Sequence, residues 1–243
     1  MSGYETWSRV VHKFGRNTDS DTGDDVWDGS SPYTFPADAG ATTIVSDSAN
    51  DTLLGTGAQI VVVQGLNAEY ELVTQTVPLN GTTSQSIESM LRVFRMFVYQ
   101  AGTGNENAGT ITCAIDGVTA AQISTGIGQT LMAIYTLPAG TWGWLQGWRA
   151  SIDATADVEL AFQVKPYREK PKNGCWLTKD VIQLDSTGAM HTEVHFPTFQ
   201  KYEPKTDFRV RVLSGLTNAI VSSQFDLLLH DQESLPPLIT PQG

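Results

Sequence analysis

Hydrophobic and polar positions alternate along much of the chain after residue 41, which is the pattern of β-strands that bury one face and expose the other. The clearest example is the segment 157–167, in which apolar and polar side chains take turns. Its apolar face consists of Val158, Leu160, Phe162 and Val164, and its polar face of Glu159, Gln163 and Lys165. Segments 208–213 and 220–230 repeat the alternation. The pattern predicts an all-β, antiparallel chain with a β-sandwich or jelly-roll-like fold.

Other strands are predicted from apolar runs and from the turn residues between them. Segment 59–64 contains an unbroken apolar run, which is expected of a strand buried on both faces. Asn80 and Gly81 form a tight-turn signal, because both residues tolerate a positive φ angle. Further strands are expected at 42–46, 69–77, 91–99, 110–115, 129–137, 141–152, 176–184 and 189–199.

The two ends of the chain do not follow this pattern. Segment 14–29 is acidic and rich in glycine but contains Trp27, and it leads into an aromatic, proline-containing segment at 31–36. Aromatic residues are unusual in a disordered linker, so residues 1–40 are predicted to form an extended arm. The arm would lie on its own domain or on a neighbouring subunit, through contacts made by Trp7, Phe14, Trp27, Tyr33 and Phe35. The proline-rich residues 231–243 are predicted to form a second arm.

The first residues allow a second interpretation. Their apolar side chains recur at helical spacing and would also fit a short amphipathic helix. These side chains are Tyr4, Trp7, Val10, Val11 and Phe14. Between the arms, Asp116 and Gly117 mark a soft boundary between a first β subdomain at 41–116 and a second at 117–230. The first set of strands makes a poor core by itself, so the two subdomains are expected to pack together.

Composition limits the classes of partner. The 243 residues include 22 Gly and 11 Pro, and the formal net charge is −11. An acidic chain is repelled by nucleic acid, so no nucleic-acid partner is expected. No apolar stretch is long enough for a spanning helix, so we expect no membrane association. The first residues lack the features of a secretory signal, so we expect the protein to be made and folded in a cytosol. Cys113 lies in a predicted strand and is expected to be a buried free thiol, and Cys175 lies near a turn.

Two groups of residues have weak metal-site signals. Asn17, Asp19, Asp21, Asp25 and Asp28 match alternating positions of a calcium loop. However, Thr22 occupies the position that requires glycine, and the last ligand is Asp rather than Glu. His191, Glu193 and His195 would share one face of a strand, which is compatible with a metal site or with a solvated face. In both cases we expect no bound metal.

One predicted strand contains Trp142, Trp144 and Trp148, all at even-numbered positions, so their side chains would line one face of a straight strand. Such a row fits a core or subunit interface, or an exposed platform for sugar rings. The sequence contains no nucleophile elbow, phosphate-binding loop or dinucleotide fingerprint. We therefore expect no enzymatic activity, no catalytic residues and no cofactor.

The region from Phe14 to Ile115 contains a series of short motifs: Phe14-Gly-Arg-Asn17, Asp25-Val-Trp-Asp-Gly29, Tyr33-Thr-Phe-Pro36, Ser48-Ala-Asn-Asp-Thr52, Gly55-Thr-Gly-Ala58, Gly65-Leu66 and Leu79-Asn-Gly-Thr-Thr83. In these motifs the chain resembles a group of small virion structural proteins of tailed bacteriophages. The resemblance implies membership of the virion, assembled in the host cytoplasm, without fixing a position in the particle.

The leading hypothesis is a capsid decoration (cement) protein. Such a protein would form dimers or trimers and would bind the major capsid protein or other virion proteins. The alternatives are a tail, adaptor or baseplate component of the same particle, and a carbohydrate-binding module or fibre head.

Overall fold

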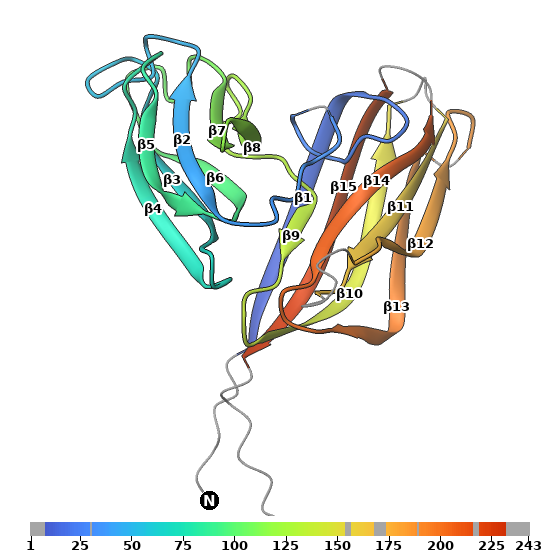
Figure 1. The fold of residues 1–243 in the computed structure, drawn as a ribbon. Coiled ribbons are helices and arrows are strands. Elements are labelled where there is room, and N and C mark those ends of the chain that lie inside the picture. Colours follow the sequence, from blue (N-terminus) through green and yellow to red (C-terminus); the bar gives the residue numbers. More distant parts are fainter. Residues whose placement is uncertain are drawn as a thin grey trace, which may run out of the picture.

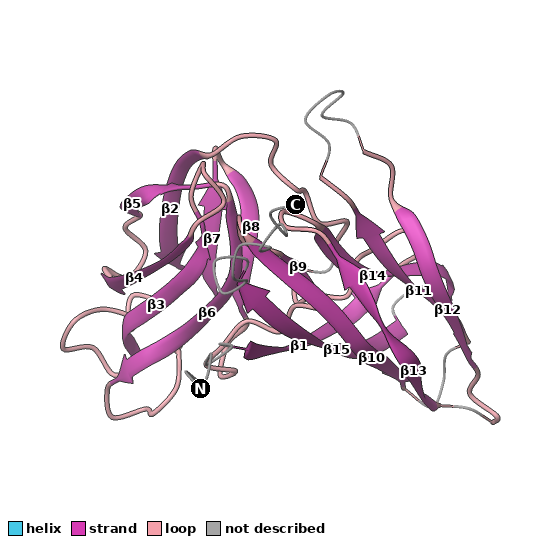
Figure 2. Ribbon diagram, turned by 90° about the horizontal axis from the view of Figure 1, so that it is seen from below, coloured by secondary structure: helices cyan, strands magenta, loops and turns pink. Residues whose placement is uncertain are grey.

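The computed structural model describes residues 8–29, 31–153, 157–167, 174–188, 190–215 and 219–231, and this part of the chain is built from β-strands without any helix (Figure 2). Its fifteen strands form four sheets, and every ladder between them is antiparallel. The prediction of an all-β, antiparallel chain is therefore confirmed. Four separate sheets, however, differ from the two sheets of the expected jelly-roll-like sandwich.

The four sheets are grouped in two bodies, each with its own core (Figure 1). The first body contains β2 (Gly40–Ser46), β3 (Ala58–Leu66), β4 (Leu72–Pro78), β5 (Gln85–Met90), β6 (Arg92–Ala101), β7 (Ile111–Ile115) and β8 (Val118–Ile123). Their sheet orders are β5-β2-β7-β8 and β4-β3-β6. Buried side chains from both sheets, including Ile44, Val61, Met96 and Cys113, form one cluster. Cys113 is a buried free thiol, as expected.

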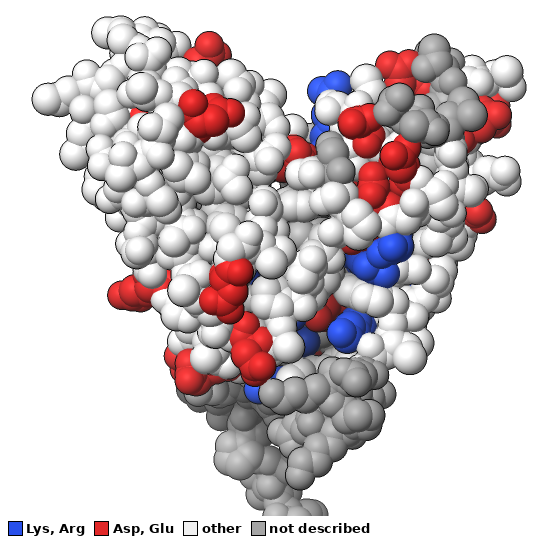
Figure 3. All heavy atoms as spheres, turned by 45° about the horizontal axis from the view of Figure 1, so that its top comes forward, with Lys and Arg blue, Asp and Glu red and all other residues white. Residues whose placement is uncertain are grey.

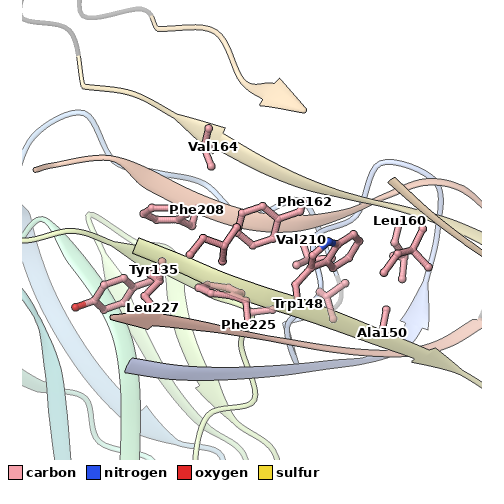
Figure 4. Packing of buried hydrophobic residues seen from close by; sticks show 14 of the residues in the cluster. Tyr135, Trp148, Ala150, Leu160, Phe162, Val164, Phe208, Val210, Phe225 and Leu227 are labelled. Carbon is pink, nitrogen blue, oxygen red and sulfur yellow. The ribbon is translucent and has the colours of Figure 1, made fainter. Parts of the chain in front are cut away.

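The second body is larger. It contains β1 (Ser8–Ser20), β9 (Ile134–Thr136), β10 (Thr141–Ile152), β11 (Val158–Lys165), β12 (Leu177–Leu184), β13 (His191–Tyr202), β14 (Asp207–Gly215) and β15 (Ala219–Asp231). The sheet orders are β1-β15-β10-β13 and β12-β11-β14-β9. Aromatic rings from both sheets meet in its core, where Phe162 lies 5.3 Å from Phe225 and 5.8 Å from Trp148 between ring centroids (Figure 4).

Residues 8–20 are a strand of the second body rather than an arm or a helix. β1 pairs with β15 from Ser8 opposite His230 to Asn17 opposite Val221, and the register shifts before Ser20. Side chains from His12 to Asn17 alternate strictly between exposed and buried, so a period of two overrides the helical spacing of the apolar residues. Of the two predicted arms, residues 1–7, Ser30 and 232–243 lie outside the described residues. Asp231, the first residue of the second arm, ends β15.

The predicted boundary at Asp116 and Gly117 is wrong, because these residues form the turn of a hairpin. Their φ angles are 48° and 79°, as a tight turn between two paired strands requires. The turn joins β7 to β8, which belong to one sheet of the first body. The first body is inserted between β1 and β9 of the second body, so the second body closes only when the two ends of the chain meet at β1 and β15.

A β-bulge divides the tryptophan row of β10. The register of β10 shifts between Leu145 and Gly147 against both of its neighbours, which reverses the faces that later side chains take. Trp148 is therefore buried, with an exposed fraction of 2%, and its indole donates a hydrogen bond of 2.8 Å to Asp180. Trp142 and Trp144 stay half-buried on the outer face, beneath the ammonium group of Lys201.

This division predicts unequal effects of two tryptophan substitutions in one strand. Trp148→Ala should lower the free energy of unfolding by about 3–5 kcal/mol, because it leaves a cavity in the aromatic core. Trp144→Ala is the matched control and should have a much smaller effect. Urea unfolding followed by circular dichroism measures both, and equal losses in the two variants would contradict the bulge.

Candidate functional site

Two extended segments cross between the bodies: the outgoing segment lies between β1 and β2, and the returning segment lies between β8 and β9. Successive side chains of each segment enter different cores. On the outgoing segment, Val26 packs into the core of the second body and Trp27 into that of the first. The returning segment repeats this, with Met132 in the first core and Ala133 in the second. Trp27 pairs with Met132 in an isolated bridge, and the amide of Ala133 donates a 2.9 Å hydrogen bond to the Val26 carbonyl. We call this contact between the bodies the joint.

Buried charges surround the joint. Asp25 is fully buried, and its carboxylate lies 3.5 Å from Arg209 and 3.6 Å from Arg211. It also accepts a 2.8 Å hydrogen bond from the amide of Tyr33. Burial raises the pKa of Asp25 to about 6, although Arg209 and the Tyr33 amide oppose this rise. Asp25 thereby fixes the outgoing segment to β14.

A second buried pair joins strands of different bodies. The guanidinium of Arg92, in β6, lies 3.3 Å from the carboxylate of Asp207, in β14. Both side chains are less than a tenth exposed, and Asp207 also accepts a 2.6 Å hydrogen bond from Thr136. Burial raises the pKa of Asp207, while Arg92 lowers it. Because each charge depends on the other in a dry environment, the pair holds the two bodies in one arrangement.

The predicted arm residues mostly fill the joint. Trp27 and Tyr33 are 2% and 4% exposed, and their ring centroids lie 5.3 Å apart. Phe35 continues the row to Trp176, at 4.9 Å. These three side chains therefore contact the chain's own bodies, which was one of the two surfaces expected for the arm. Phe14 is 38% exposed, and Trp7 lies outside the described residues.

The two metal hypotheses find no support in the geometry. Asn17 and Asp25 of the proposed calcium loop are fully buried, and Asp25 faces two arginines rather than an open cation site. Glu193 of the histidine group pairs with Arg149 at 3.3 Å and with His195 at 3.2 Å. Within the described ranges, no three His, Cys, Asp or Glu side chains form a group that could hold a metal ion.

The most distinctive hollow on the surface is a groove of about 560 Å³ between the bodies, which we call the interbody groove. Strands β1, β3, β4, β6, β9 and β15 line it, together with residues that precede β9. The lining residues are Arg9, Val10, Val11, His12, Lys13, Phe14, Gln64, Leu72, Val73, Thr74, Phe94, Arg95, Gln129, Thr130, Tyr135 and Leu229. No Asp or Glu is among them, although the chain has a net charge of −11.

Lys13 is the most unusual residue of the interbody groove. It is 7% exposed, its ammonium group donates a hydrogen bond to the Phe94 carbonyl, and it lies 5.7 Å from the centroid of the Phe94 ring. Among the described residues, no carboxylate lies within ion-pair distance of it. Burial, and to a lesser extent the charge of the neighbouring Arg95, lowers the pKa of Lys13 to about 7. The groove therefore contains a buried lysine that has no carboxylate partner among the described residues.

The charged side chains are unevenly distributed over the surface. On the face drawn in Figure 3, acidic side chains are spread over both bodies, whereas the few Lys and Arg side chains lie mainly on the second body. Two of the groove's basic residues already have partners: Arg9 pairs with Asp231 at 3.0 Å, and His12 with Asp226 at 2.5 Å. Lys13 and Arg95 are the groove cations without a carboxylate among the residues described.

Sequence reasoning did not identify this groove. Lys13 sits among apolar residues at strand spacing, so its burial could have been expected once β1 was recognised as a strand. Arg95 and the β4 residues come from another body, and only the fold brings them close to Lys13. No helix among the described residues is long and apolar enough to cross a membrane.

Comparisons with known proteins find no matching family model and no matching curated protein. Among solved structures, one of the infectious bursal disease virus Gt strain aligns over 96% of this chain and 74% of its own, with 12% identity and a TM-score of 0.22. A VP2 protein of the same virus, in derived T=1 particles, aligns over 93% of this chain and 74% of its own, with 11% identity and a TM-score of 0.18. At this level the likeness carries no argument about function.

The Arg92–Asp207 pair generates a stability prediction. Arg92→Ala leaves the Asp207 carboxylate buried without its counter-ion, so it should lower the free energy of unfolding by about 3–5 kcal/mol. Arg9→Ala breaks the exposed pair with Asp231 and should cost less than about 1 kcal/mol. Denaturant unfolding measures both. A loss below about 1 kcal/mol for Arg92→Ala would show that the pair does not hold the bodies together.

Asp28, at the end of the outgoing segment, generates a pH prediction. Burial raises its pKa from 3.8 to about 7, so folding favours the protonated carboxyl, and Asp28 makes the chain less stable as the pH rises from about 4 to above 7. Asp28→Asn should remove this decline, and its melting temperature should exceed the parent's at pH 8 but not at pH 4. The exposed Asp19→Asn is the control. Parallel melting profiles of Asp28→Asn and the parent would contradict the assignment.

Proposed function

We propose that the chain is a virion structural protein, and that it acts as a capsid decoration (cement) protein. In this role it binds the outer shell of a particle through subunit contacts and stabilises it. The motifs between Phe14 and Ile115 that resemble virion structural proteins of tailed bacteriophages support the virion assignment. Each two-sheet body would serve as a compact β-sandwich unit of the kind that such particles use. The proposal assigns no catalytic activity and no cofactor.

The interbody groove is the observation that carries the proposal. An acidic chain presents there a hollow lined by both apolar and polar side chains, in which Lys13 has no carboxylate partner among the described residues, and such a mixed surface suits a protein partner. The joint holds both walls of the groove in fixed positions through buried pairs such as Arg92 with Asp207. A rigid site loses little entropy on binding, and this favours a static structural contact. The partner would be the major capsid protein or another virion protein, bound by a dimer or trimer of this chain.

Copy number tests the decoration role against a tail, adaptor or baseplate role. Quantitative mass spectrometry of purified particles should find hundreds of copies of the chain for a decoration protein, whereas a connector or tail ring has about six to twelve. Particles without the chain should also lose their genome at a lower temperature, and adding purified chain should restore the parent value. A ring-like copy number would refute the decoration role and favour the alternative within the same particle.

Carbohydrate binding is the second candidate, because Trp142 and Trp144 remain on the outer face of β10. Their rings are partly covered, since the Lys201 ammonium group lies 4.0 Å and 5.5 Å from the two ring centroids. A sugar would have to displace this cation before stacking. On a glycan array, binding that Trp144→Ala abolishes would favour this candidate over decoration.

A further inference from the structure

The interbody groove runs along the edge of a strand rather than over one face. It contacts six consecutive residues of β1, from Arg9 to Phe14. Because successive side chains of a strand point to opposite faces, a hollow that reaches all six must lie beside the backbone. In the described sheet, β15 is the single neighbour of β1, so the other edge carries backbone N–H and C=O groups without a strand partner.

Among the described residues, a backbone hydrogen bond to this edge of β1 is found at its far end. The amide of Arg16 donates a 3.4 Å hydrogen bond to the Leu131 carbonyl. At Gly15 the two segments of the joint approach so closely that a Cβ would lie 2.2 Å from the Val26 carbonyl oxygen. The edge is thus closed from Gly15 onward, and no described strand pairs with it from Arg9 to Phe14, a length of about 20 Å for six extended residues.

The opposite wall has the character of a strand-binding surface. Three consecutive residues of β4, Leu72 to Thr74, line it, and β4 is also an edge strand. Leu72 is 44% exposed. Apolar side chains of Phe94 and Tyr135 lie at the groove as well, with ring centroids 4.9 Å apart. An extended segment placed here would have backbone partners on one side and apolar contacts on the other.

The charge of the groove selects the side chains of such a segment. Lys13 is buried without a carboxylate partner among the residues described, and the neighbouring Arg95 is positively charged. A buried cation without a counter-ion is costly, and an incoming carboxylate would remove part of that cost while gaining a charge-assisted hydrogen bond. A segment carrying Lys or Arg at this position would instead be repelled.

We propose that the interbody groove binds an extended, acidic and apolar segment of another virion protein, which adds as a strand to the open edge of β1 and places a carboxylate against Lys13 and Arg95. The identity of the partner as a virion protein depends on the function proposed above. The binding chemistry does not, so it can be tested with purified chain alone.

The test uses fluorescein-labelled peptides of eight residues in which valine and threonine alternate and two central positions are glutamate. Fluorescence anisotropy should show binding at least about tenfold tighter than that of the same peptide with glutamine at both positions, since a charge-assisted hydrogen bond to the buried Lys13 contributes about 1.4 kcal/mol or more. N-methylation of alternate backbone amides should abolish binding of the glutamate peptide, because it removes the donors that strand addition needs.

Matched variants of β1 locate the site. Lys13→Met replaces the buried cation with an apolar side chain of similar length, so the protein should remain folded, as circular dichroism can verify. It should reduce the preference for glutamate over glutamine to less than about threefold. Arg16→Met removes an exposed cation from the same strand outside the groove and should leave the preference unchanged.

Three results would overturn the proposal. The first is equal binding of the glutamate and glutamine peptides, and the second is an unchanged preference in Lys13→Met. The third is self-association of the chain that Lys13→Met abolishes, since a second copy would then be the occupant. None of these results bears on the copy number in particles, so failure of this proposal and failure of the decoration role can be told apart.

Discussion

The two-body arrangement depends on the joint, where two extended segments lie between two cores. Val26 and Trp27 are neighbours in sequence but belong to different cores, and Met132 and Ala133 repeat this division. In an extended segment the side-chain period of two sends alternate residues to opposite sides, so one segment can contribute to both cores at once. Neither body can then move without exposing apolar surface that the other one covers.

Buried charges make this joint specific rather than merely apolar. Asp25 with Arg209, and Arg92 with Asp207, tie the crossing segment and the first body to β14. Ion pairs that are removed from water add little net stability, but breaking one leaves a buried charge, so alternative placements of the two bodies are strongly disfavoured. The interbody groove follows from this rigidity, because its walls come from both bodies and keep a fixed separation.

The groove also explains how a chain with a charge of −11 can attract an acidic partner. No Asp or Glu lines the groove, whereas Lys13 is buried there with the exposed Arg95 beside it, and burial reduces the solvent screening of Lys13. Net charge describes long-range behaviour, such as repulsion of nucleic acid, whereas docking depends on the few charges inside a hollow. The insertion of the first body between β1 and β9 creates that hollow beside a strand edge.

The sequence by itself determined the all-β class, many of the strands and the burial of Cys113, because alternation and turn residues act locally. It did not reveal β5 or β8, whose short segments 85–90 and 118–123 carry weak apolar patterns, nor the pairing of β1 with β15. Only the tertiary structure decided that Trp148 lies in the core while Trp144 stays outside, since the one-residue bulge between them switches the face of the sheet to which later side chains point. It alone placed Lys13 beside Arg95, because contacts between distant segments depend on how the sheets pack.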